Sequence, residues 1–111
     1  MLRRVVLLLG ALSVGVVLLG GVALAENIKG TFGPDNLKGT NRLDRIYGLG
    51  NSDTIATLGG NDDCYGGSGA DGISCGAGND SIDGGFGQNI LFDGPGNDKI
   101  SAVDDQLDRV N

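Results

Sequence analysis

Histidine is absent from this 111-residue sequence, and glutamate occurs once, as Glu26. Without histidine, a zinc or other transition-metal site lacks its usual ligand. With a single glutamate, no segment pairs the Asp/Asn ladder of an EF-hand with its closing glutamate. No nucleophile stands in a recognisable arrangement with a base either, so we expect no enzymatic activity.

Basic residues are scarce as well. Six of the eight follow residue 25, together with all 14 acidic residues, so residues 26–111 carry a formal net charge of −8. Nucleic acids and anionic membranes are bound through patches of Lys and Arg. This charge therefore disfavours both partners and suits a cation.

Residues 1–25 have the pattern of a signal peptide. An arginine pair at residues 3–4 precedes an apolar stretch over about residues 5–22, and Ala23-Leu24-Ala25 supplies the small residues that a signal peptidase reads. We expect a signal-peptide helix, cleavage after Ala25 and a secreted mature protein. The alternative is an uncleaved membrane anchor, because the apolar stretch approaches the length of about 20 residues that spans a bilayer.

Residues 26–111 are expected to form one domain, because a nine-residue unit repeats eight times over residues 30–101 without insertion or deletion. The sixth position of the unit reads Asp35, Asp44, Asp53, Asp62, Asp71, Asp80, Asn89 and Asp98. The eighth position reads Leu37, Ile46, Ile55, Cys64, Ile73, Ile82, Leu91 and Ile100. The fourth position is mostly glycine, with Arg42 and Asn51 among the exceptions. Three columns in register predict a coil of stacked repeats rather than an acidic linker.

Each unit is expected to contain a turn and a very short strand. Glycine in positions one to six reaches positive φ at little steric cost. Positions seven to nine suit a strand with its middle side chain inward. With two units in a coil, each unit stacks on the next unit but one. The sixth-position residues then form one row of Asp35, Asp53, Asp71 and Asn89 and a second row of Asp44, Asp62, Asp80 and Asp98.

Carboxylates stacked at the strand spacing of about 4.8 Å repel one another unless a divalent cation lies between them. Eight inward apolar side chains are also too few to offset the ordering entropy of a glycine-rich chain, so folding requires a ligand. Calcium fits, because it accepts carboxylates and backbone carbonyls together, whereas magnesium demands stricter octahedral geometry. The sequence therefore predicts several bound Ca²⁺ ions.

Three units carry the pattern most clearly: GGSGADGIS at residues 66–74, CGAGNDSID at 75–83 and DGPGNDKIS at 93–101. They resemble the glycine-rich nonapeptide of the RTX (repeats-in-toxin, haemolysin-type) calcium-binding family, and the resemblance covers residues 30–101. It implies an all-β, parallel β-roll (a β-solenoid) of about four 18-residue coils, with calcium held between neighbouring turns. The sixth-position residues would be the ligands, and glycine carbonyls would complete each shell.

Some units depart from this pattern. Asn89 brings no charge, so a site there should be weaker. Arg42 replaces the fourth-position glycine and adds a positive charge near Asp44. This makes residues 39–47 the poorest calcium-binding unit, and residues 48–83 are the best stretch.

The two edges of the repeat are degenerate. Glu26 and Ile28 put residues 26–29 in phase with the unit, so these residues could form a first strand. Residues 108–110 repeat the Asp-x-apolar pattern one residue late. Residues 102–111 could therefore form a thin cap over the open edge of the roll.

Cys64 and Cys75 are the only cysteines. An even pair in an exported chain favours a disulfide. Both side chains could point into the same narrow interior from opposite sheets. The alternative is two unpaired small residues.

Together these patterns predict a secreted, monomeric, non-enzymatic β-roll whose folding is coupled to Ca²⁺ binding. Two other functions stay open. One is a cell-surface adhesion or carbohydrate-binding module with structural calcium. Tyr47 and Tyr65, at the ninth position of units that stack on each other, could lie together on one outer face, either as a platform for a sugar ring or only on each other. The other is a remnant of a larger RTX toxin or protease.

Overall fold

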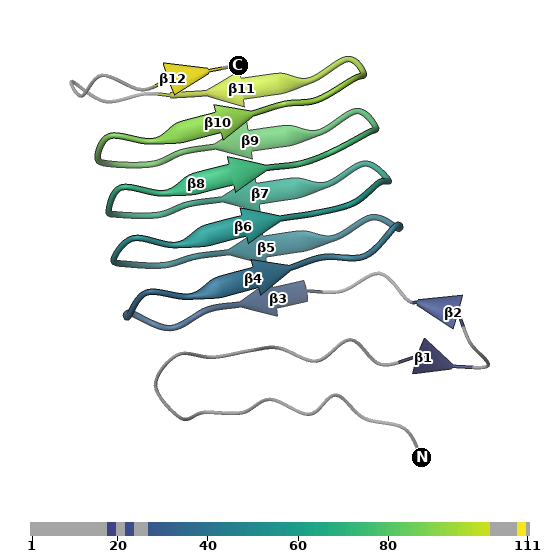
Figure 1. The fold of residues 1–111 in the computed structure, drawn as a ribbon, viewed down its shortest axis with the longest axis horizontal. Coiled ribbons are helices and arrows are strands. Elements are labelled where there is room, and N and C mark those ends of the chain that lie inside the picture. The colour runs from purple at the N-terminus through teal and green to yellow at the C-terminus, as the bar shows by residue number, and fades with distance from the viewer. Residues whose placement is uncertain (1–17, 20–21, 24–26, 103–108, 111) are drawn as a thin grey trace.

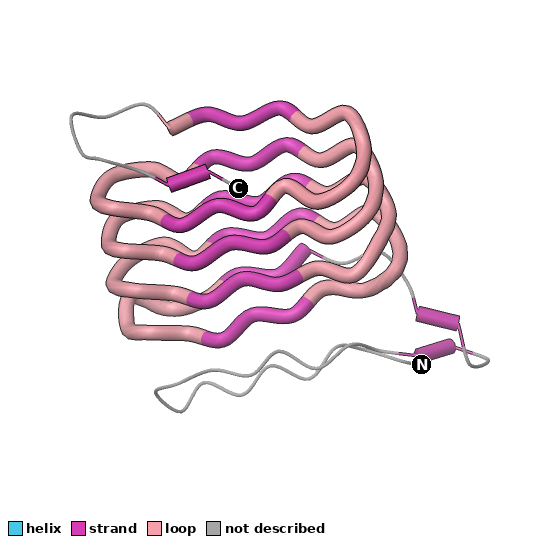
Figure 2. Tube along the Cα trace, turned by 45° about the horizontal axis from the view of Figure 1, so that its top comes forward, coloured by secondary structure: helices cyan, strands magenta, loops and turns pink. Residues whose placement is uncertain are grey.

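A computed structural model describes residues 18–19, 22–23, 27–102 and 109–110 of the chain. These residues form an all-β parallel β-solenoid of about four coils, and none of them is helical (Figure 1). The coils lie one on another, with short strands on two faces and turns at both sides (Figure 2). The predicted parallel β-roll is confirmed.

The solenoid has two parallel sheets of five strands each. One sheet consists of β4 (Asn36–Lys38), β6 (Thr54–Ala56), β8 (Gly72–Ser74), β10 (Ile90–Phe92) and β12 (Arg109–Val110). The other consists of β3 (Asn27–Lys29), β5 (Arg45–Tyr47), β7 (Asp63–Tyr65), β9 (Ser81–Asp83) and β11 (Lys99–Ser101). Successive strands from β3 to β11 alternate between the two sheets, so each coil contributes one strand to each of them (Figure 1).

Neighbouring strands from β3 to β11 are paired at a constant offset of two repeat units. Leu37 lies beside Ile55, which in turn lies beside Ile73, and the other sheet keeps the same spacing. At the C-terminal edge the offset is longer by one position, because Val110 pairs with Leu91. The constant offset confirms that the coils stack two units at a time.

The core consists of two facing columns of side chains, and each strand contributes one side chain to its column. The middle residue of a strand points inward and its two neighbours point outward or to the rim, as in β4 and β10. The buried core consists of Ile28, Leu37, Ile46, Ile55, Cys64, Ile73, Cys75, Ile82 and Leu91, and Ile100 packs against it in part. The eighth-position column is therefore the core, as the repeat predicts.

Both cysteines lie in this core. The sulfur atoms of Cys64 and Cys75 lie 2.6 Å apart, and both residues are free thiols in the structure. The predicted disulfide is therefore not confirmed. The adjacent Cys75 sulfur and burial raise the pKa of the Cys64 thiol.

The predicted signal-peptide helix is not confirmed. Of residues 1–25 the structure describes only β1 (Leu18–Leu19) and β2 (Val22–Ala23), which pair as antiparallel strands. The rest of that segment lies outside the described residues. Within the described part of the chain, no helix has the length and apolar character needed to cross a membrane.

The close approach of the coils predicts unequal effects for two glycines of one unit. Gly69 has φ +121°, and a Cβ on it would collide with the carbonyl of Asn51 in the preceding coil. Gly72, in β8, has open space at its Cβ position. Gly69→Ala should lower the free energy of unfolding by about 1–3 kcal/mol or more, whereas Gly72→Ala should be neutral or stabilise by up to about 1 kcal/mol. Denaturant unfolding of both variants measures the difference, and equal losses would mean that the coils do not stack in this register.

Candidate metal centre

The sixth-position residues lie at the end of each turn, directly before a strand. Seven of them are at most 5% exposed, and Asp98, near the C-terminal edge, is half-buried. Turns two units apart lie on the same side of the solenoid, so these residues form the two rows that the repeat predicts. Each row therefore stacks carboxylates inside the protein, where charge is costly.

One oxygen of six of these side chains joins neighbouring coils. The backbone N–H of Asp35 donates to Asp53 Oδ1 (2.9 Å), and the backbone N–H of Asp53 donates to Asp71 Oδ1 (2.8 Å). The same bond, at 2.8–2.9 Å, joins Asp44 to Asp62, Asp62 to Asp80, Asp80 to Asp98 and Asp71 to Asn89. We call these six bonds the Oδ1 ladder. It satisfies two backbone donors in each of the first three coils and fixes the orientation of the six side chains that accept it.

The second oxygen has no partner in five of the turns. The buried atoms without a hydrogen-bond partner are Oδ2 of Asp53, Asp62, Asp71, Asp80 and Asp98. The hydroxyl of Thr57 is close enough to the Asp62 carboxyl to lower its pKa in part, but it donates its hydrogen bond to the carbonyl oxygen of Cys75 at 2.7 Å, so Asp62 Oδ2 keeps no donor of its own. Buried carboxylate oxygens are rarely left unpaired, so the same orphan atom in five equivalent places indicates a missing positive group.

Two of these orphan oxygens lie directly against a glycine. A Cβ at Gly48 would lie 2.6 Å from Asp53 Oδ2 and 2.5 Å from the carbonyl oxygen of Gly66. A Cβ at Gly66 would meet Asp71 Oδ2 and the carbonyl oxygen of Gly84 at the same two distances. Only glycine therefore lets a carboxylate oxygen and a main-chain carbonyl of the next coil converge on one place.

Burial also changes the acidity of these carboxyls. It raises the pKa of Asp53, Asp71 and Asp80 from 3.8 to about 6, and the backbone hydrogen bond of the Oδ1 ladder offsets only part of this effect. Burial raises the pKa of Asp62 in the same direction. Without a counter-ion, the ionised carboxylates destabilise the folded chain near neutral pH.

Most turns beside the orphan oxygens share a distinctive backbone. In residues 66–71 and 75–80 the second and fourth positions have positive φ, and all four of these residues are glycine, whereas residues 57–62 have positive φ at Gly60 alone. In residues 48–53 the same two positions are Leu49 (φ +81°) and Asn51 (φ +69°). A leucine at positive φ is uncommon, so its surroundings impose this turn conformation despite the strain.

Protein side chains alone do not complete a metal shell. No group of three or more His, Cys, Asp or Glu side chains capable of holding a metal ion occurs among the described residues. Calcium, however, takes backbone carbonyls together with carboxylates. The orphan Oδ2 atoms and the neighbouring main-chain carbonyls therefore fit calcium, as the sequence predicts, and do not fit zinc.

Two turns differ from the rest in a way that the sequence analysis missed. Thr31 and Thr40, in the second position, donate to the sixth-position carboxylates of their own turns. The signal in the sequence is the hydroxyl residue that replaces glycine or leucine in the second position. These two turns hold the carboxylates of Asp35 and Asp44.

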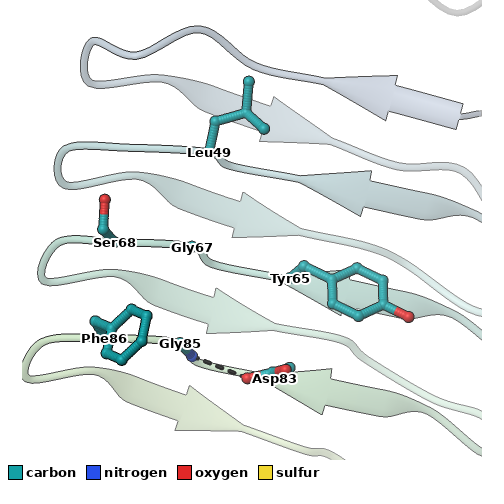
Figure 3. Close-up of a pocket in the computed structure, with 7 residues that line it drawn as sticks. All are labelled: Leu49, Tyr65, Gly67, Ser68, Asp83, Gly85 and Phe86. Atoms are coloured by element: carbon teal, nitrogen blue, oxygen red, sulfur yellow. Dashed lines mark hydrogen bonds between the residues drawn. The ribbon is translucent and has the colours of Figure 1, made fainter. Parts of the chain in front are cut away.

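A shallow hollow lies on the outer surface beside one row of turns. Its volume is about 390 Å³, and its walls include Tyr65, Phe86 and Leu49 (Figure 3). Asp83 lies at its side and accepts a hydrogen bond from the backbone N–H of Gly85 at 3.0 Å. Tyr65 also stacks on Tyr47, with ring centroids 4.9 Å apart and planes 6° from parallel, so the predicted stacking of the two tyrosines is confirmed.

Comparison with known proteins agrees with this geometry. Residues 38–73 and 76–103 match the family described as RTX calcium-binding nonapeptide repeat (4 copies). No curated protein and no solved structure gives a significant match. The family match covers more than half of the chain and includes most turns with an orphan carboxylate oxygen. This chain belongs to the family of RTX calcium-binding nonapeptide repeats.

Proposed function

We propose that this protein is a secreted, non-enzymatic β-roll that binds several Ca²⁺ ions and folds with them. The observation that carries the proposal is the buried, unpartnered Oδ2 atom at the same place in five turns. The family match supports calcium as the ion. The protein acts as a monomer in this proposal.

The ions would be held by Asp53, Asp62, Asp71, Asp80 and Asp98 through Oδ2, with main-chain carbonyls of the glycine-rich turns as further ligands. Bound calcium would supply the positive charge that two rows of buried carboxylates need. The chain itself orients each of these carboxylates, because the Oδ1 ladder holds one oxygen and leaves the other without a partner.

Secretion rests on the pattern of residues 1–25 and agrees with the cysteine pair. An exported chain meets an oxidising environment, in which Cys64 and Cys75 could form the predicted disulfide. A non-enzymatic role rests on the lack of histidine and of a nucleophile–base pair in the sequence. The repeated carboxylates are better explained as ligands than as acid–base catalysts, because they recur with the period of the fold.

A carbohydrate-binding or adhesion role is the second candidate, and the hollow beside Tyr65 favours it. Phe86, which is 71% exposed, and the stacked pair of Tyr47 and Tyr65 offer flat apolar surfaces. The Asp83 carboxylate and the Ser68 hydroxyl supply polar groups in the same hollow. Aromatic faces combined with a few polar groups suit a sugar ring. Calcium would then be structural.

Calcium-driven folding is the main test. Metal-stripped protein should lose most of its β-sheet signal in far-UV circular dichroism, and millimolar calcium should restore it, because the ligand is needed to neutralise the buried carboxylates. Magnesium at equal concentration should do much less. The proposal fails if the spectrum and the thermal midpoint are the same with and without calcium.

A pair of variants tests the ligands. Asp71→Ala removes an orphan oxygen together with the ladder acceptor of the Asp53 N–H, whereas Asp63→Ala removes the surface partner of Arg45 (Nε at 3.3 Å) and a charge beside Asp62, but no orphan oxygen. Asp71→Ala should raise the calcium concentration for half-folding at least several-fold, and Asp63→Ala should change it much less. Equal, small effects would mean that the buried carboxylates do not bind the ion.

The pH dependence should reverse in sign when calcium is present. The folded-state pKa of Asp53, Asp71 and Asp80 is about 6, above the ordinary 3.8. Without metal, stability is therefore greatest below the ordinary value and falls as pH rises through 6, so metal-stripped protein should gain β-sheet signal between about pH 7.5 and pH 5. With calcium, the same acidification should lower the thermal midpoint, because protons compete with the ion. Movement in one direction under both conditions would contradict the proposed role of these carboxyls.

The carbohydrate role has its own test. Calcium-loaded protein should co-sediment with insoluble cell-wall polysaccharide, and Tyr65→Ala should weaken this binding because it removes a wall of the hollow. Leu58→Ala is the matched control, since Leu58 is an exposed apolar residue (61%) on the opposite row of turns. Binding that is absent, or equally weakened by both variants, would exclude the hollow as a sugar site.

A further inference from the structure

In two turns, residues 30–35 and 39–44, the turn itself supplies hydrogen-bond donors to its sixth-position carboxylate. In residues 30–35 the backbone N–H of Thr31 donates to Asp35 Oδ2 at 2.5 Å, and the Thr31 hydroxyl lies 3.1 Å from both carboxylate oxygens. In residues 39–44 the N–H of Thr40 donates to Asp44 Oδ2 at 2.6 Å, with the hydroxyl at 3.0–3.1 Å. The oxygen that is orphaned in five other turns therefore has donors here.

The backbone of these two turns differs accordingly. Neither contains a residue with positive φ, although Gly33 stands in the fourth position of the first. Threonine is β-branched and would enter the positive-φ region only with strain. The second-position threonine therefore selects another turn, one that directs its N–H and hydroxyl at the carboxylate.

A third turn, residues 84–89, keeps the glycine conformation but contains an amide in place of the carboxylate. Gly85 (φ +77°) and Gly87 (φ +105°) resemble their counterparts in other turns. Asn89 Oδ1 accepts the bond from the backbone N–H of Asp71, as the Oδ1 ladder requires. Asn89 Nδ2 then donates to the carbonyl oxygens of Gly85 (3.3 Å) and Gly87 (3.2 Å).

The amide therefore supplies the positive group of this turn. The two N–H bonds of the Asn89 side chain point at the main-chain carbonyls of the second and fourth positions of the turn. These carbonyl oxygens are of the type that a calcium ion would need as ligands. An amide NH₂ cannot share that place with a cation, because both carry positive charge on the facing atoms. Where the sequence predicts a weaker calcium site, the Asn89 amide makes internal hydrogen bonds to these carbonyls.

We propose that three of the eight turns, those ending at Asp35, Asp44 and Asn89, close without calcium, and that Thr31, Thr40 and the Asn89 amide replace the ion. This inference rests on the proposed function, since it assigns which turns bind. At most five ions are then held, one for each orphan Oδ2. Both threonine turns lie in the first coil, so the N-terminal edge of the solenoid depends least on the ion.

Asn89→Asp tests the third turn. The substitution removes the two amide donors and creates a sixth orphan oxygen, so native mass spectrometry of the full chain should show one more bound calcium ion than the wild type. Its thermal midpoint should rise in calcium and fall in metal-stripped buffer, where sucrose can be added to favour the compact state. Gln88→Glu is the matched control, because it adds the same charge on the adjacent exposed residue and should add no ion.

Two further variants test the threonine turns. Asp35→Asn should leave the number of bound ions unchanged, whereas Asp71→Asn should lower it by at least one. The inference is overturned if the wild type holds more than five ions, if Asp35→Asn loses an ion from an otherwise folded protein, or if Asn89→Asp shifts the midpoint in the same direction in both buffers. A wild type that binds no calcium would instead refute the proposed function itself.

Discussion

The hydrogen bond from the backbone N–H of one sixth-position residue to Oδ1 of its counterpart in the next coil controls the rest of the site. It ties every coil to the next and orients the six side chains that accept it, those of Asp53, Asp62, Asp71, Asp80, Asn89 and Asp98. In these carboxylates one oxygen is engaged in the bond and the other is presented at a constant place, whereas in the first coil Asp35 and Asp44 accept from Thr31 and Thr40 instead. The surroundings of that second oxygen then decide the chemistry of the turn, and these surroundings vary chiefly through the second position of the repeat.

This arrangement divides the solenoid along its axis. The first coil, with Thr31 and Thr40, satisfies its own carboxylates, and the coils that follow carry orphan oxygens. An edge of a stack lacks a neighbour on one side, so an ion shared between coils has fewer ligands there. In the first coil, the N–H and hydroxyl groups of Thr31 and Thr40 take the place of the ligands that the edge lacks. The second coil therefore packs on a neighbour whose shape, in this proposal, does not depend on calcium.

The sequence predicts the periodic part of this structure well, because the repeat period fixes both the inward column and the stacking of alternate units. Ile46 and Ile73 are buried, and Tyr47 lies on Tyr65, for that reason alone. It does not predict the direction of individual hydrogen bonds. The sequence predicts a weak ligand at Asn89 but not that its Nδ2 faces two carbonyls, and nothing in the repeat indicates that the N–H of Thr31 faces Asp35. Such choices depend on local φ and on a rotamer, which composition and spacing leave undetermined.

The two sheets of the solenoid are related by a screw operation: one repeat unit advances the chain by half a coil and exchanges the faces. The inner positions of successive units are alike, so the interior is nearly symmetric under this operation, but the outer surfaces are not. Loss or duplication of a single unit would leave the core and the Oδ1 ladder in phase, yet it would transfer every later residue to the opposite face. A change between Tyr47 and Tyr65 would therefore separate the two stacked rings. A lineage of such proteins can therefore change length by single units and keep its fold, whereas it keeps a particular outer surface only if it changes by whole coils.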